Sequence, residues 1–245
     1  MKIEAKGLHY RNLNDKIHEA LAGGTREILL NQINGQRYIG DALKGSGIKI
    51  TIQGTPGNDL GVFMDGPTIV VRGNAQDGVG NTMNGGRILI YGDAGDIVGY
   101  AMRGGKIYIR GNAGYRVGIH MKAFNEFFPV ILIGGRAGNF LGEYMAGGLM
   151  IVLGLDQNGK DSPVGTYVGT GMHAGKIYVR GHVRDYQLGR EIRVFDMDKK
   201  DWEEMNPFLE EYCRDFNLPL DEIRQSPFVK LIPHTHRPYG KLYAY

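Results

Sequence analysis

Residues 154–161, with the sequence GLDQNGKD, come close to a phosphate-binding loop. In that motif backbone amides hold the phosphates, a lysine contacts them, and a Ser or Thr after the lysine binds magnesium. Gly154, Gly159 and Lys160 fit the pattern, but Asp161 stands where Ser or Thr is needed. The next residues, SPVGTYVG, do not predict a helix, so the helix N-terminus that would bind the anion is missing. The sequence therefore disfavours phosphate binding here.

Histidines and arginines supply two further candidate sites. His234 and His236 could place both imidazoles on one side of a strand, but no third ligand is evident, so ordinary hydrogen bonds are expected. Arg72, Arg110 and Arg180 share one outward position of the repeat described below and could form a basic ladder for a carboxylate or phosphate. Surface arginines more often pair with acids. We expect no catalytic residue, metal or cofactor in this chain.

The composition excludes several classes of protein. Glycine is the outlier, with 39 of 245 residues, about 16% against a usual level of roughly 7%. The net charge of +3, with 22% charged residues, is too mild to indicate nucleic acid or an anionic membrane as partner. The single cysteine, Cys213, excludes an intrachain disulfide or a cysteine-based cluster built by this chain alone. Because no apolar stretch is long enough for a signal or membrane segment, we expect a soluble cytoplasmic protein.

A 19-residue repeat organises the chain, and any functional residue has to be positioned by it. Met64, Met83, Met102 and Met121 fall 19 residues apart. A fixed period with glycines at fixed places is typical of solenoids. We expect glycine at the corners because it enters positive φ without a Cβ clash. The structural glycines of the repeat are Gly54, Gly61, Gly73, Gly80, Gly92, Gly99, Gly111, Gly118, Gly135, Gly142, Gly154, Gly169 and Gly181.

Aliphatic residues alternate before the first glycine of every repeat. The positions four and two residues before that glycine are apolar in all repeats, for example Ile88 and Ile90 before Gly92. Period-two alternation predicts a short strand with one inward face. A second apolar stripe, which includes Val79 and Val98, precedes the later glycine and predicts a second strand. The pattern indicates an all-β protein, a right-handed parallel β-helix of about seven coils.

The segments outside the array predict caps. Residues 1–43 form an N-terminal cap, residues 44–190 the β-helix, and residues 191–245 a helical and irregular C-terminal tail. In the first of these, Asn14 or Asp15 is expected to cap a helix over roughly 15–22. The repeat spacing breaks after Met121, by five residues within 122–128, and after Gly154, by eight within 155–163; both insertions are predicted loops.

The middle coils are apolar on their outward positions as well. Leu132, Ile151 and Leu153 form this outer patch, which something must cover. Either the chain's own tail covers it, or the patch is a partner surface. The sequence leaves both alternatives open.

These repeats resemble a known family. The segments GDAGDIVG and GNAGYRVG resemble the glycine-repeat (GXGXG) β-helix domain at the C-terminus of the large subunit of glutamate synthase. The lead-in INGQRYIGDALKG, with Arg37 and Gly40 in matching places, is similar too, and NGGRILIYGDAGDIVGYAM is the nearest stretch. The resemblance covers roughly residues 26–190.

The resemblance implies a role without catalysis. The family enzyme transfers the amide nitrogen of glutamine to 2-oxoglutarate with an N-terminal cysteine nucleophile, an FMN barrel and an iron–sulfur cluster. This chain starts Met1-Lys2, and Cys213 lies in the tail. The resemblance therefore implies a scaffold subunit that assembles with glutaminase and FMN-dependent synthase subunits.

Three alternatives remain. The small subunit of formylmethanofuran dehydrogenase carries similar repeats, so the chain could be a component of that type. It could instead be a free-standing enzyme or small-molecule binder that uses the loops at 122–128 and 155–163. It could also be a homo-oligomeric structural module that buries its own outer stripe.

Overall fold

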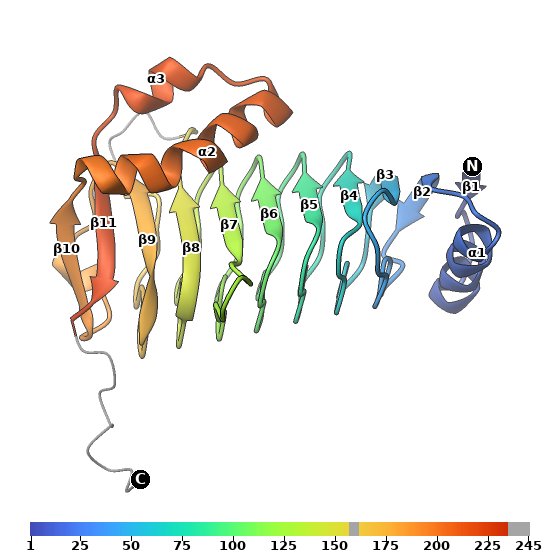
Figure 1. Ribbon diagram of the computed structural model, residues 1–245, viewed down its shortest axis with the longest axis horizontal. Coiled ribbons are helices and arrows are strands. Elements are labelled where there is room, and N and C mark those ends of the chain that lie inside the picture. The colour runs from blue at the N-terminus through green and yellow to red at the C-terminus, as the bar shows by residue number, and fades with distance from the viewer. Residues whose placement is uncertain (157–161, 235–245) are drawn as a thin grey trace, which may run out of the picture.

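The computed structural model describes residues 1–156 and 162–234, and in it the chain forms a β-solenoid (Figure 1). One strand is formed per coil because aliphatic residues alternate with outward residues just before each turn. In chain order the elements are β1 (Lys2–Glu4), α1 (Tyr10–Ala22), β2 (Glu27–Asn34), β3 (Lys49–Thr55), β4 (Thr68–Val71), β5 (Arg87–Ile90), β6 (Lys106–Ile109), β7 (Val130–Ile133), β8 (Ala146–Val152), β9 (Ala174–Arg180), the 3-10 helix η1 (Asp185–Gln187), β10 (Ile192–Asp196), α2 (Lys199–Phe216), α3 (Leu220–Arg224) and β11 (Phe228–Pro233).

The strands stack in sequence order, which confirms the predicted β-solenoid. In the described part of the chain the sheet has the order β1-β2-β3-β4-β5-β6-β7-β8-β9-β11-β10. Neighbouring strands from β1 to β9 are parallel. Their register pairs equivalent residues of successive coils, so that Ile69 is the partner of Ile88, and Ile88 is the partner of Ile107. The seven predicted coils correspond to β3–β9, and six turns of chain connect these strands. One long, stiff sheet face results.

The interior is filled by the two predicted apolar stripes. The strand residues Ile69 and Ile88 are fully buried, and so are the methionines that mark the period. Val79 and Val98 of the second stripe are also buried, but they lie in turns, so the prediction of a second strand in each repeat is wrong. The backbone amides of these turns still bond from coil to coil, as Gly80 N does to Leu60 O at 2.8 Å.

The glycines of the repeat serve two different physical needs. Gly80 and its equivalents have φ near +66°, and a Cβ on Gly61 would lie 2.7 Å from Ile88 Cδ1 of the core. Gly92 and Gly111 do not have positive φ, so their predicted role as left-handed corners is wrong. At these positions a Cβ would overlap a side-chain oxygen from the preceding coil.

That oxygen belongs to a ladder of Asn and Asp side chains along one edge of the solenoid. Asn74 Oδ1 accepts a hydrogen bond from Asp93 N, Asp93 Oδ1 from Asn112 N, and Asn112 Oδ1 from Arg136 N, at 2.7–2.9 Å. Each side chain therefore satisfies a backbone donor of the next coil, which would otherwise be lost at a turn. The glycine that precedes each donor residue, such as Gly92 before Asp93, leaves room for the accepting side-chain oxygen.

The predicted boundaries shift at both ends. Strand β2 pairs in parallel register with β3, Ile28 opposite Ile50, so the solenoid begins inside the segment predicted to be a cap. Helix α1 starts at Tyr10 and has His9 rather than Asn14 or Asp15 as its N-cap. At the other end the tail contributes strands as well as helices, because β11 inserts antiparallel between β9 and β10.

Candidate functional site

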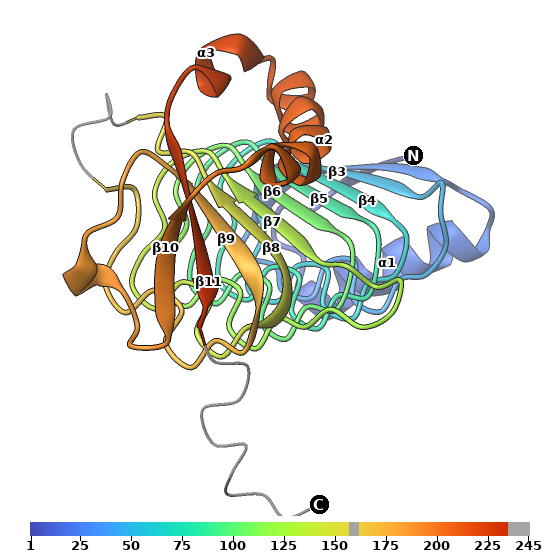
Figure 2. The ribbon, with the colours of Figure 1, turned by 60° about the vertical axis from the view of Figure 1, so that its left-hand side comes forward.

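Helix α2 covers the apolar outer face of the sheet (Figure 2). Leu132, Ile151 and Leu153 are 0% exposed and belong to one cluster with Leu209 and Tyr212 of the helix. Burying them removes a large apolar area from water, which is the main force that holds the helix in place. The chain's own tail therefore covers this patch, and the alternative that it is a partner surface is wrong.

Charged clusters fix both halves of this helix to the strands. Near its start, Asp201 accepts hydrogen bonds from Lys230 Nζ and Tyr178 Oη, at 2.5 and 2.9 Å. Burial acts to raise the pKa of Asp201, but these bonds and one from the Asp198 backbone outweigh it, so the pKa lies below its usual range. Burial, reinforced by neighbouring carboxylates such as Glu204, raises the pKa of Tyr178.

The second cluster is centred on Glu211, in the C-terminal half of the same helix. Glu211 accepts hydrogen bonds from Lys106 Nζ at 2.6 Å and Tyr108 Oη at 2.9 Å, while Arg87 pairs with Asp215 and Glu211. Burial acts to raise the pKa of Glu211, but the bonds from Lys106 and Tyr108 and the charge of Arg87 lower it overall. These ionised groups are structural, since they join the helix to β5 and β6.

The arginines considered for an anion site do not converge. Arg72 lies 3.9 Å from the ring centroid of Tyr91, which stands between it and Arg110 on the stack. Arg180 donates from Nη1 to the Leu153 carbonyl oxygen at 3.2 Å. Burial lowers the pKa of Arg180. The candidate basic ladder of Arg72, Arg110 and Arg180 therefore does not form one binding site.

The other candidates are only partly described. Gly159, Lys160 and Asp161 lie outside the described residues, and so does His236. The His234 imidazole Nδ1 lies 2.7 Å from the carbonyl oxygen of Glu191, an ordinary backbone contact. Burial raises the pKa of Cys213 to about 11, so this cysteine is a neutral thiol at physiological pH.

Stacked aromatic side chains line one flank of the solenoid and were not predicted. His120 stacks on Tyr144 with ring centroids 5.3 Å apart, and Phe140 stacks on Tyr167 at 4.9 Å. Tyr144 and Tyr167 are 45% and 54% exposed. We call this surface the aromatic flank; it consists of Tyr100, His120, Phe140, Tyr144 and Tyr167.

The backbone of the flank explains its regularity. His120, Phe140, Tyr144 and Tyr167 all have φ between +53° and +62°. In this conformation the amides of His120, Phe140 and Tyr144 donate to carbonyl oxygens of the next coil, at 2.8–3.0 Å. Left-handed backbone costs a bulky residue roughly 1–2 kcal/mol. The hydrogen bonds between coils therefore impose the left-handed backbone conformation. As a result, equivalent side chains of successive coils stack on the outer surface.

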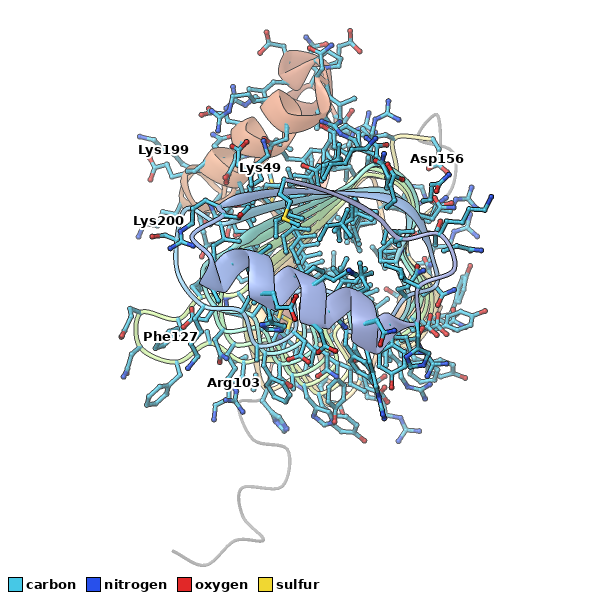
Figure 3. The ribbon with its side chains drawn as sticks, turned by 90° about the vertical axis from the view of Figure 1, so that its right-hand side faces the viewer. Lys49, Arg103, Phe127, Asp156, Lys199 and Lys200 are labelled. Carbon is cyan, nitrogen blue, oxygen red and sulfur yellow. The ribbon has the colours of Figure 1, made fainter. Side chains whose placement is uncertain are left out.

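A cleft opens where the repeat is interrupted. It has a volume of about 400 Å³ and is lined by Asn84, Arg103, Lys122, Phe124 and Phe127. Figure 3 shows Arg103 and Phe127 projecting on the same side of the solenoid. The broken spacing of the repeat indicated the loop at 122–128 but not the residues from the neighbouring coils. Asn84, Arg103 and Lys122 are 19 residues apart, and this spacing was the sequence signal that could have identified them as neighbours.

Two other properties bear on function. No helix in the part of the chain that the structure describes is long and apolar enough to cross a membrane. Within 1–156 and 162–234, no three His, Cys, Asp or Glu side chains gather in a way that would hold a metal ion.

Comparison with known proteins places the chain in a family. It is 49% identical, over 99% of its length and 95% of the relative's, to the uncharacterized protein MJ1350 of Methanocaldococcus jannaschii. Its fold matches, with a TM-score of 0.62 and 24% identity, a chain of the formyltransferase/hydrolase complex (FhcABCD) from Methylorubrum extorquens, solved with methylofuran. The match covers 83% of this chain and 72% of that one. The GXGXG motif family matches residues 23–233, and the chain belongs to this family.

Proposed function

We propose that this chain is a non-catalytic structural subunit of a glutamate-synthase-type complex, in which it holds glutaminase and FMN-dependent synthase polypeptides. Membership of the GXGXG motif family supports this role. So does the lead-in INGQRYIG, which spans the end of β2 and the turn that follows it.

The observation that carries the proposal is the aromatic flank. Tyr and other aromatic side chains are enriched in protein interfaces, where rigid rings bury much area at a low cost in conformational entropy. Here Tyr100, Tyr144 and Tyr167 stay 38–54% exposed. Because the coils behind them are fully packed, the flank is a stiff surface of the kind that a scaffold offers to partners.

The partner surface that meets the flank is expected to be apolar with hydrogen-bonding groups and to carry little net charge. Arg116 pairs with Glu143 at 2.9 Å and its guanidinium lies 4.7 Å from the Phe140 ring centroid, so its charge is compensated within the flank. A surface with stacked rings and paired charges favours docking through apolar contact and hydrogen bonds from the tyrosine hydroxyls. It does not favour an oppositely charged polymer.

A second candidate is a component like the small repeat-bearing subunit of formylmethanofuran dehydrogenase. The observation that favours it is the fold shared with a chain of the formyltransferase/hydrolase complex. A third possibility, a homo-oligomer, differs from both because its particle would contain this chain alone at a multiple of the monomer mass.

Purification of the tagged chain from its native cells tests these proposals. We expect a particle that contains separate glutaminase and FMN-binding polypeptides together with this chain. Recovery of formyltransferase and hydrolase polypeptides would instead support the second candidate. Recovery of this chain alone, at the mass of a monomer, would contradict both.

A further inference from the structure

The cleft beside the 122–128 loop is built from one side chain of each of three successive coils. Asn84, Arg103 and Lys122 each follow a buried methionine of the repeat and stand 19 residues apart. Neighbouring strands in a sheet lie about 4.8 Å apart, so the three polar ends form a short column. The position changes to Ala146 in the next coil, which ends the column.

Both cations in this column lack a partner within the described parts of the chain. Among these residues, neither the Arg103 guanidinium nor the Lys122 ammonium makes an ion pair or a hydrogen bond. The same repeat position one coil before Asn84 holds an acid, Asp65, whose carboxylate lies by the backbone of Gly85. Glu126 stands at the exposed tip of the loop. The cleft therefore has an excess of positive charge, which attracts an anion.

Two phenyl rings also line the cleft. The loop turns back on itself as a small hairpin, in which the Phe124 and Phe127 amides and carbonyls are joined by two hydrogen bonds of 3.0 Å. Phe127 also packs close to Gly104, since its Cδ1 lies 3.5 Å from the position that a Cβ on that glycine would take. Phe124 and Phe127 are nonetheless 64% and 44% exposed. A fixed hairpin that leaves two large rings exposed is an unusual use of apolar surface.

The cations and rings that line one cleft define a ligand class. Arginine and lysine bind carboxylate and phosphate groups through charge-assisted hydrogen bonds, and Asn84 adds an amide that donates and accepts. Phenyl rings favour stacking with a planar ring. A volume of about 400 Å³ suits a small ligand. We propose that this cleft binds a small organic anion whose carboxylate or phosphate group is joined to a planar ring.

Calorimetric titration of the full chain with four probes tests the proposal. AMP carries a phosphate and a planar base, indole-3-acetate a carboxylate and a planar ring, adenosine a base alone, and inorganic phosphate an anion alone. We expect AMP or indole-3-acetate, or both, to bind at least tenfold more tightly than adenosine and phosphate. If neither exceeds adenosine and phosphate, the proposal is overturned.

Substitutions locate the site. Arg103→Gln and Lys122→Gln should each weaken binding of the better probe at least fivefold, and Phe124→Leu should weaken it while leaving the affinity for phosphate unchanged. Lys200→Gln, the same change at an exposed lysine of α2 away from the cleft, is the matched control (Figure 3). Circular dichroism checks that every variant is folded. Unchanged affinity in the Arg103→Gln, Lys122→Gln double variant, or an equal loss in the control, would contradict the proposal.

Discussion

The hydroxyl of Tyr212 donates a hydrogen bond to the carbonyl oxygen of Ile109 at 3.0 Å, across 103 residues of sequence. It reaches that oxygen because the next coil has Gly134 at the outward position, where a Cβ would overlap both the Tyr212 hydroxyl and the Arg110 carbonyl oxygen. Gly134, which is not one of the structural glycines of the repeat, thus makes room for α2.

We therefore expect Gly134→Ala to destabilise the chain by about 1–3 kcal/mol, the usual cost of overpacking a filled site. Urea denaturation followed by circular dichroism measures it. Gly23→Ala is the matched control, since Gly23 ends α1 with φ −74° and a Cβ there would make ordinary contacts of 3.5 Å. Equal effects of the two substitutions would show that Gly134 does not make room for Tyr212.

Leu132→Ala tests whether the tail covers the outer face in the isolated chain. Leu132 is 0% exposed beneath α2, so its truncation should leave a cavity and cost about 2–5 kcal/mol. Val194→Ala on the edge strand β10, where the side chain is 36% exposed, should change the free energy of unfolding by less than about 1 kcal/mol. A neutral Leu132→Ala would mean that the patch is solvent-exposed until a partner binds.

The attachment of α2 should weaken in acid. The folded pKa of Glu211 is lowered, so its contribution to stability is present above the unfolded value of about 4 and is lost as pH falls through the folded value. We expect the free energy of unfolding to fall as pH drops below about 5. Glu211→Gln should cost about 1–3 kcal/mol at pH 7 and should flatten the acid dependence.

Urea titrations at several pH values between 7 and 3 measure the free energy of unfolding of the parent protein and of Glu211→Gln. Lys199, an exposed residue in the first turn of the same helix, provides the control substitution Lys199→Gln, which should leave the pH profile unchanged. Parallel profiles for the parent and Glu211→Gln would contradict a structural role for this carboxylate.

Much of the solenoid could be predicted because its rules are local and repeat. Ile88 and Ile90 alternate before a glycine in the same way in every coil, so strand position, inward face and stacking follow from period two and period 19. The first coil was missed because β2 pairs with β3 through an irregularity between Leu30 and Ile33, which shifts the spacing. One irregular coil suffices to hide a repeat unit.

The roles of individual residues were harder to predict. A glycine is needed at position 92 because the side chain of Asn74 from the preceding coil occupies the space. The recurrence of Asn74, Asp93 and Asn112 along the ladder was a sequence signal for this need. The positive φ of His120 and Tyr144 was not readable, since intrinsic preference opposes it and only bonds between coils impose it. The aromatic flank therefore emerges only from the structure.

Co-purification of partners with a variant of the aromatic flank tests the central claim most directly. Tyr144→Ser combined with Tyr167→Ser removes two exposed, stacked rings, while Tyr186→Ser removes a ring that is 67% exposed outside the flank. If the flank holds the glutaminase and synthase polypeptides, their yield should fall roughly tenfold or more with the double variant and stay unchanged with Tyr186→Ser. An unchanged yield with the double variant, or an equal loss with the control, would contradict the scaffold role proposed for this surface.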